Sequence, residues 1–163
     1  MVASDAALLR LVWHPSHFED GKLKGSAFDK ADLIPLMDKR SQQLRYMSVD
    51  LEESVSKDAV NYVIANQQAD RKDQKLGRHE ANFVRFISGE LESYIDTKGR
   101  SVFSVEPAPI PASVTNPRNA AHCAVRRKFV AEKSEQEVFV QEVRTALLEL
   151  NRGILSYNDV FPA

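Results

Sequence analysis

Histidine, serine and aspartate side chains stand near the ends of several apolar segments of this 163-residue chain. Imidazole titrates near neutral pH, so a histidine beside a hydroxyl or a carboxylate is a common general base. If these side chains share one pocket, the chain is a small transferase or hydrolase in which Asp50 orients the histidine base. The residues expected in that pocket are His14, His17, Ser26, Ser48, Asp50 and His122.

Two pairs of side chains have the chemistry of zinc ligands, namely His14 with His17 and His122 with Cys123. Structural zinc sites usually have regularly spaced ligand pairs, and Pro15 excludes the helical spacing of a metalloprotease motif. The histidines are better interpreted as loop residues that bond backbone carbonyls. The sequence therefore predicts no metal and no cofactor.

Cys123 is the only cysteine, and its neighbour His122 raises the alternative of a thiol nucleophile. Adjacent residues of a strand point to opposite faces, so His122 cannot readily act as the base for Cys123. A lone cysteine within an apolar stretch is usually a small core residue, and that interpretation is preferred. A single cysteine also favours a reducing compartment, the cytoplasm.

The loop Gly21-Lys-Leu-Lys-Gly-Ser26 contains glycines and lysines, but not in the order that cradles a nucleotide phosphate. We interpret it as a turn. The formal net charge of −1 provides no global positive field, so nucleic-acid binding is unsupported. A weak nucleic-acid hypothesis rests on Arg126, Arg127 and Lys128, for which a solvated strand edge is the simpler interpretation.

Three stretches, Gly21–Phe28, Met47–Asp50 and Asn119–Val125, together resemble an uncharacterised group of small bacterial proteins. In that group an apolar strand ends in His-Pro, a glycine-containing loop leads to Ser, Ala and Phe, and Leu-Ser-Val-Asp and Asn-Pro-x-His-Ala motifs follow. Here Met47, Ala120 and Cys123 replace the leucine, proline and alanine. The resemblance implies a bacterial origin and no particular activity. It singles out Ser26, Ser48, Asp50, Asn119 and His122, although such residues also end strands and pin loops.

Apolar and β-branched runs bounded by glycine and proline predict strands at residues 7–13, 44–50, 82–88, 100–106 and 122–129. One helix is expected after Ser54 or Ser56, and a second is expected after a capping box of Ser134 and Glu137. The order lacks a regular strand-helix-strand rhythm. We therefore expect a single α+β domain over residues 1–153, with a mainly antiparallel sheet and two principal helices.

No recognisable catalytic motif accompanies these elements, so the leading hypothesis is a non-catalytic subunit or accessory protein of a bacterial multiprotein system. The apolar tail, residues 154–163, either folds back on the core or docks on another protein subunit, or on a second copy of the chain. Its candidate partner-binding residues are Leu155, Tyr157, Val160 and Phe161. No basic leader and no apolar run of membrane-spanning length is visible, which predicts a soluble, cytoplasmic protein without membrane contact.

Overall fold

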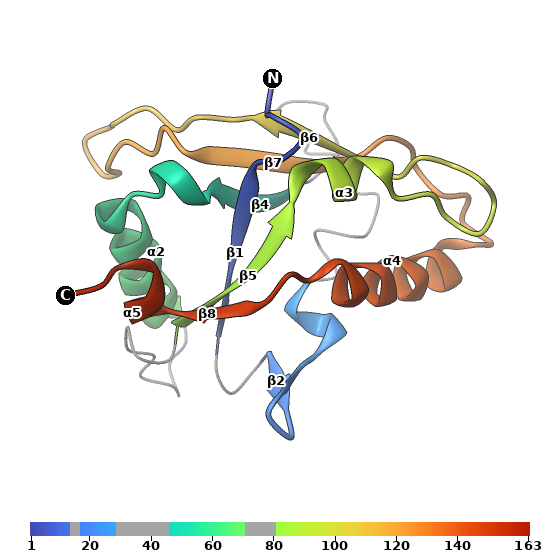
Figure 1. The fold of residues 1–163 in the computed structure, drawn as a ribbon, viewed down its shortest axis with the longest axis horizontal. Coiled ribbons are helices and arrows are strands. Elements are labelled where there is room, and N and C mark those ends of the chain that lie inside the picture. Colours follow the sequence, from blue (N-terminus) through green and yellow to red (C-terminus); the bar gives the residue numbers. More distant parts are fainter. Residues whose placement is uncertain (14–16, 29–45, 71–80) are drawn as a thin grey trace.

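Six strands form one antiparallel sheet in the order β6-β7-β4-β1-β5-β8 in this computed structural model (Figure 1). The structure describes residues 1–13, 17–28, 46–70 and 81–163. The strands are β1 (Ala7–Trp13), β4 (Tyr46–Leu51), β5 (Ala81–Ile87), β6 (Phe103–Pro107), β7 (His122–Arg127) and β8 (Ile154–Ser156). A separate ribbon pairs β2 (Phe18–Glu19) with β3 (Lys22–Leu23).

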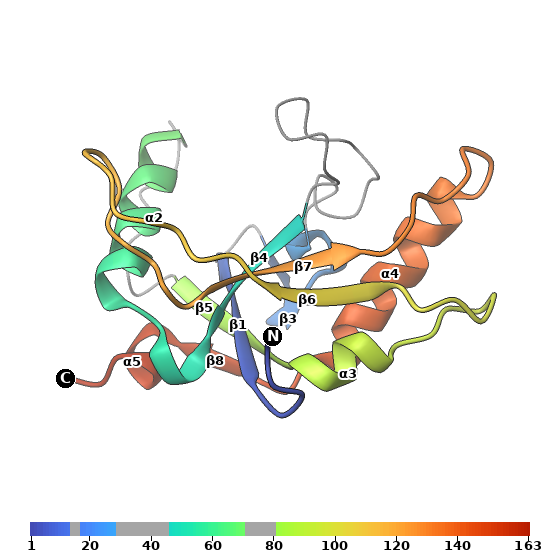
Figure 2. The ribbon, with the colours of Figure 1, turned by 90° about the horizontal axis from the view of Figure 1, so that it is seen from above.

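Two substantial helices, α2 (Lys57–Asp70) and α4 (Gln136–Leu150), lie on opposite sides of the sheet (Figure 2). The short helices are η1 (Gly25–Ala27), η2 (Glu52–Ser54), α3 (Ser88–Ser93) and α5 (Tyr157–Val160). The predicted α+β domain with a mainly antiparallel sheet and two principal helices is thereby confirmed. None of the helices in the described part of the chain has the length and apolar character needed to cross a bilayer.

The central strand β1 has the bounds predicted from its apolar run, and it separates two hydrophobic cores. Because successive side chains of a strand point to opposite faces, Leu8 and Val12 enter the larger core beneath α4. Leu9 and Trp13 enter the smaller core beneath α2. Every one of these four side chains is buried, so both faces of the sheet are covered along β1.

Helix α4 covers the larger core with one apolar side, on which Phe139, Val140, Val143, Ala146 and Leu147 are buried. The apolar spacing of the sequence predicted this side with Leu150 in place of Val140, and Leu150 is only partly buried. The predicted capping box of Ser134 and Glu137 is wrong. The residue that caps the helix is Glu135, and its side chain forms no hydrogen bond to the amides of the first turn. The Glu135 carboxylate instead pairs with Lys98 and Arg100.

Helix α2 covers the smaller core through Val60 and Ile64. Of the two serines expected to open it, Ser56 does so, because its Oγ accepts a hydrogen bond from the Ala59 amide (3.2 Å). Tyr62 links this helix to the proline-containing segment between β6 and β7, donating its hydroxyl to Asn116 Oδ1 (2.5 Å). Both views place that segment beside α2 (Figures 1 and 2).

The C-terminal tail is folded back. Strand β8 pairs with β5, and α5 follows it directly, opened by a capping box between Ser156 and Asp159. The four residues considered for partner binding, Leu155, Tyr157, Val160 and Phe161, all belong to the smaller core or pack against it. In this structure they are therefore part of the protein's own interior, because β5 would otherwise leave an unpaired edge and Phe83 an exposed ring.

We predict that Tyr157→Ala lowers the free energy of unfolding by about 3 kcal/mol, because the ring is 6% exposed and fills the smaller core. Tyr157→Phe should lower the free energy of unfolding by only about 1 kcal/mol, because it removes only the hydrogen bond from the Tyr157 hydroxyl to Asn61 Oδ1 (2.6 Å). Urea unfolding measures both, with the exposed Asn158→Ala as control. Equal stability of Tyr157→Ala and the wild type would show that the tail is not part of the fold.

Candidate functional site

The alternation of β4 places two predicted site residues on one face of the sheet. Met47 and Val49 point into the larger core. Ser48 and Asp50 therefore point to the opposite face, toward α2. In the antiparallel register Asp50 lies directly between Leu9 of β1 and His122 of β7, and paired residues share a face.

A cavity of about 500 Å³ opens above these residues. The sheet forms the floor of the cavity. Helix α2 and Ile110, from the segment between β6 and β7, form its roof. The polar lining residues are Arg10, His17, Ser48, Asp50, Asn119 and His122, and the apolar ones are Leu9, Leu11, Trp13, Ala59, Val60, Val63 and Ile110. This mixture of an apolar wall with a few convergent polar groups is typical of a small-molecule site.

Asn119 anchors the proline-containing segment to the sheet. Its Nδ2 donates to Asp50 Oδ1 (2.9 Å), and its backbone exchanges hydrogen bonds with Ile110 (2.8 and 2.9 Å). The residue is 8% exposed, and within the described part of the chain its Oδ1 has no hydrogen-bond partner. A buried acceptor without a hydrogen-bond partner is unusual in a folded protein and often marks a functional position.

His122 is held by the backbone rather than by a carboxylate. Its Nδ1 lies 2.7 Å from the Ala108 carbonyl oxygen, and because a carbonyl only accepts, Nδ1 carries the proton. In the neutral ring the lone pair is then on Nε2. The sequence predicted that Asp50 orients the histidine, and this prediction is wrong. The Ala108 carbonyl oxygen is the hydrogen-bond partner of His122 Nδ1, and Asp50 accepts its hydrogen bond from Asn119.

The other polar groups of the cavity are tied to β1 and β4. His17 Nδ1 accepts from the Trp13 amide (3.0 Å), so in its neutral form the proton of this ring is on Nε2. Arg10 Nη1 donates to the Ser48 carbonyl oxygen (3.3 Å). The two histidines of the cavity therefore carry their protons on different nitrogens.

Burial sets the electrostatics of the site. Desolvation raises the pKa of Asp50, although the hydrogen bond from Asn119 and the charge of His122 oppose it. Burial also raises the pKa of the Cys123 thiol, with a smaller contribution from Asp50. Cys123 lies in the larger core, on the face opposite His122, which agrees with its interpretation as a core residue.

The structure brings together four of the six residues expected in the pocket: His17, Ser48, Asp50 and His122. Ser26 is not among them, since it lies in η1, next to Gly25, which approaches Arg144 of α4 on the other side of the sheet. His14 lies outside the described residues. Trp13, Ile110 and the lining residues of α2 were not expected in the site, because only the folded chain brings these segments together.

The basic cluster of β7 is not one surface. Arg127 is buried, and the alternation of the strand separates it from Arg126 and Lys128. Arg126 pairs with Glu106 (3.1 Å) and lies over the Tyr46 ring (4.7 Å), while Lys128 donates to Ser101 Oγ (2.8 Å). The three cations do not form the continuous positive patch that a nucleic-acid site requires.

No group of three metal-ligating side chains occurs within the described ranges. Comparison with protein-family models, with curated proteins and with solved structures gives no match for this chain. The resemblance to a group of small bacterial proteins therefore stays a prediction, and the function has to be argued from the cavity itself.

We predict that Asp50→Asn stabilises the protein at pH 7 by about 0.5–1 kcal/mol. The folded protein holds the pKa of Asp50 above its ordinary value of 3.8, so ionising this carboxyl favours the unfolded chain. Protonated Asp50 therefore contributes to the free energy of unfolding of the wild type. This contribution is fully present below pH 3.8, and it is lost as the pH rises through the raised pKa of the folded protein.

Chemical denaturation at several pH values measures this effect, and the advantage of Asp50→Asn should disappear in acid. Glu53→Gln is the matched control, because it removes a carboxylate from an exposed residue of η2. A variant Asp50→Asn less stable than the wild type at pH 7 would contradict the assignment of Asp50 to a desolvated site.

Proposed function

We propose that this chain is a small enzyme of the transferase or hydrolase type, with His122 as its general base. The observation that carries the proposal is the hydrogen bond from His122 Nδ1 to the Ala108 carbonyl oxygen, since it leaves the lone pair of the neutral ring on Nε2 of a residue that lines the cavity. Clustering of Ser48, Asp50 and His122 in that cavity is the arrangement that distinguishes an enzyme from a purely structural set of polar residues.

In a hydrolytic step, His122 Nε2 takes a proton from a water molecule while the water oxygen bonds to the electrophilic atom of the substrate. The same proton then passes to the leaving group as its bond breaks, so the histidine ends the cycle neutral. In a transfer step the hydroxyl of an acceptor molecule replaces the water. Asp50 and Asn119 hold the polar part of the substrate, and Trp13 and Val60 contact its apolar part.

This mechanism differs from that of a serine-histidine-aspartate triad, in which the carboxylate bonds Nδ1 of the base. Here a backbone carbonyl fixes the tautomer, which frees Asp50 for substrate binding. Ser48 lies diagonally from His122 across the β4–β7 pair and is exposed, so its hydroxyl is available to hydrogen-bond a substrate.

We predict that His122→Asn lowers the turnover rate by a factor of about 100 or more. Asparagine keeps an N–H donor for the Ala108 carbonyl oxygen but has no basic nitrogen. The wild type is assayed against aryl esters, aryl phosphates and aryl amides, with release of the coloured phenol or aniline as the readout. His122→Gln serves as a companion variant that places a polar atom near the position of Nε2.

Thermal unfolding of both variants provides the control for folding. Ser104→Ala, which changes a residue of the same sheet face outside the cavity, should retain full activity. Retention of wild-type turnover by His122→Asn, or no turnover of any of the three substrate classes by the wild type, would contradict the catalytic proposal.

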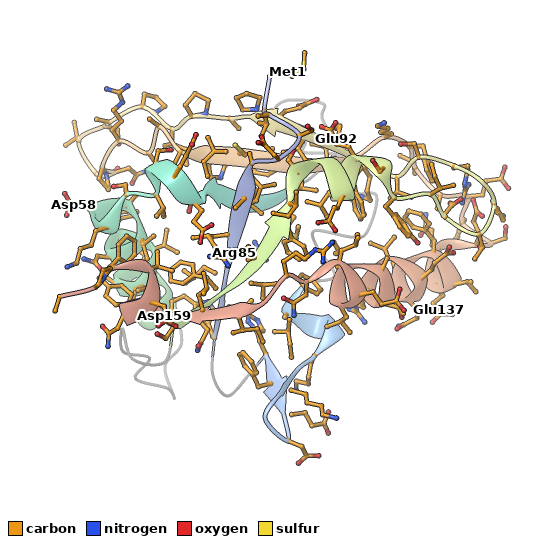
Figure 3. All side chains as sticks on the ribbon, in the orientation of Figure 1. Met1, Asp58, Arg85, Glu92, Glu137 and Asp159 are labelled. Atoms are coloured by element: carbon orange, nitrogen blue, oxygen red, sulfur yellow. The ribbon has the colours of Figure 1, made fainter. Side chains whose placement is uncertain are left out.

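We also propose, as a second candidate function, that the chain is an interaction subunit that binds a basic amphipathic segment of a partner protein. Support comes from a groove between α4 and residues 94–97, in which Ile95 (51% exposed) and Val138 (71% exposed) present apolar surface. Its lining contains Asp96, Glu137, Glu142 and Glu149, and no lysine or arginine among the residues that the structure describes (Glu137 is labelled in Figure 3).

The negative potential of this groove acts on Tyr94, whose pKa is raised to about 12 by burial and by the carboxylates of Glu142, Asp96 and Glu149. Asp96 is neutralised by Arg100, and Glu142 accepts hydrogen bonds from Thr97. Within the described residues Glu137 and Glu149 form no ion pair. An apolar groove with unpaired acidic groups complements a segment that carries lysine or arginine beside leucine or valine.

We predict that an amphipathic leucine–lysine peptide binds this groove and that Glu149→Lys weakens the binding by a factor of about 5 or more at low salt. Fluorescence anisotropy of the labelled peptide is the measurement. Glu53→Lys, which makes the same charge change on η2, should leave the affinity nearly unchanged. Equal effects of the two variants, or equal binding of a leucine–glutamate peptide, would refute the groove as the docking site.

A further inference from the structure

Three of the polar residues that line the cavity containing Asp50 have one property in common. Asp50 carries a carboxylate, Asn119 presents Oδ1, and His122 has its lone pair on Nε2. All three groups can accept hydrogen bonds. The Nδ1 proton of His122 is used by the Ala108 carbonyl oxygen, and one of the two N–H donors of Asn119 Nδ2 is used by Asp50. A ligand that only accepts hydrogen bonds would bring no donor to these three acceptors.

We infer that the ligand of this cavity carries a cationic, hydrogen-bond-donating head group of the amidinium, guanidinium or ammonium class, attached to a compact apolar body. The inference rests on the proposed cavity site and deepens it by naming the class of substrate. It does not depend on whether the ligand is turned over.

Asn119 supplies the strongest argument. Because its Nδ2 donates to the Asp50 carboxylate, the orientation of the amide is fixed, and Oδ1 is left as a buried acceptor without a partner in the described part of the protein. The residue is 8% exposed, and water therefore has little access to this oxygen. A ligand N–H group placed here would satisfy an acceptor that the described part of the protein leaves without a partner.

Asp50 supplies the charge. Its position opposite Leu9 and His122 keeps the carboxyl on the cavity face of the sheet, and one of its oxygens is bonded to Asn119. Burial disfavours the ionised carboxylate, and a bound cation reverses this penalty by pairing with it. An anionic ligand would instead add a second negative charge to the same poorly solvated position.

Arg10 also lines the cavity, but its charge is directed elsewhere. In the register of β1 with β5 it pairs with Val84, a residue of the larger core, so its side chain leaves the sheet on the face opposite Asp50. Its Nη1 donates to the Ser48 carbonyl oxygen (3.3 Å). The guanidinium of Arg10 therefore does not neutralise Asp50 from within the cavity.

The remaining wall selects an apolar body. Trp13, Val60 and Ile110 contribute aromatic and branched aliphatic surface, and the partly exposed Val63 lies where the cavity meets solvent. At about 500 Å³ the cavity accommodates a small ring system or a short aliphatic chain rather than a polymer segment. Benzamidine has both required features, a donor-rich cation and an apolar ring.

Trp13 is the only tryptophan of the chain, and it lines this cavity, so its fluorescence reports occupancy directly. Benzamidine is titrated against the wild-type protein, with benzamide as the neutral isostere and benzoate as the anionic one. We expect saturable binding of benzamidine with a Kd of about 1 mM or tighter, benzamide weaker by a factor of about 10, and no binding of benzoate. The Trp13 indole N–H signal in a ¹H–¹⁵N spectrum provides a second readout.

Asp50→Asn should weaken benzamidine binding by a factor of about 10 or more, whereas Glu53→Gln should leave it unchanged. Binding of benzoate as tight as that of benzamidine, no saturation by about 10 mM benzamidine, or an unaltered Kd in Asp50→Asn would overturn the inference. Benzamidine binding without turnover of any substrate supports the inference and rejects the catalytic proposal, so the two failures are distinguishable.

Discussion

The position of β4 between β1 and β7 is the constraint on which the rest of this structure depends. Its antiparallel registers with both neighbours put Asp50 beside Leu9 and opposite His122. The same alternation sends Met47 and Val49 into the larger core, so a slip of one residue would bury Ser48 and Asp50 among apolar side chains. The burial of Met47 and Val49 on one face of β4 therefore fixes Ser48 and Asp50 on the other face. The position of the cavity residues thus depends on the packing of the larger core.

The polar face is maintained at a cost to stability that the two cores offset. Asn119 and His122 are buried and Asp50 is partly buried, in an environment where charges and unpaired acceptors are unfavourable. The smaller core on the same face of the sheet depends on elements far apart in the chain. Helix α2, the segment between β6 and β7, and the folded-back tail all contribute to this side of the molecule. A site built on the rigid centre of a sheet and enclosed by such elements has its polar groups fixed before a ligand arrives.

Local patterns in the sequence were sufficient to predict β1, most of the apolar side of α4, and the side of β4 that carries Ser48 and Asp50. They left the start of α2 open between Ser54 and Ser56, and the structure selects Ser56. The pairing of Asp50 with His122 could not be predicted, because it depends on strand order and register between segments about seventy residues apart. The role given to Asp50 was wrong for a related reason: the Ala108 carbonyl, brought to His122 by the pairing of β6 with β7, takes the nitrogen that the carboxylate was expected to bond. Strand β6 also starts later than expected, because the Asp96 carboxylate holds the amides of Lys98 and Arg100 in a turn.

The most direct test of this account is the position of the imidazole protons, which long-range ¹H–¹⁵N correlation spectra report at about pH 8, where histidines are mostly neutral. We predict that His122 carries its proton on Nδ1, held by the Ala108 carbonyl, and that His17 carries its proton on Nε2. A His122 ring protonated on Nε2 would mean that no basic nitrogen is available in the cavity, and both the general base and the acceptor cluster assigned to this site would be lost.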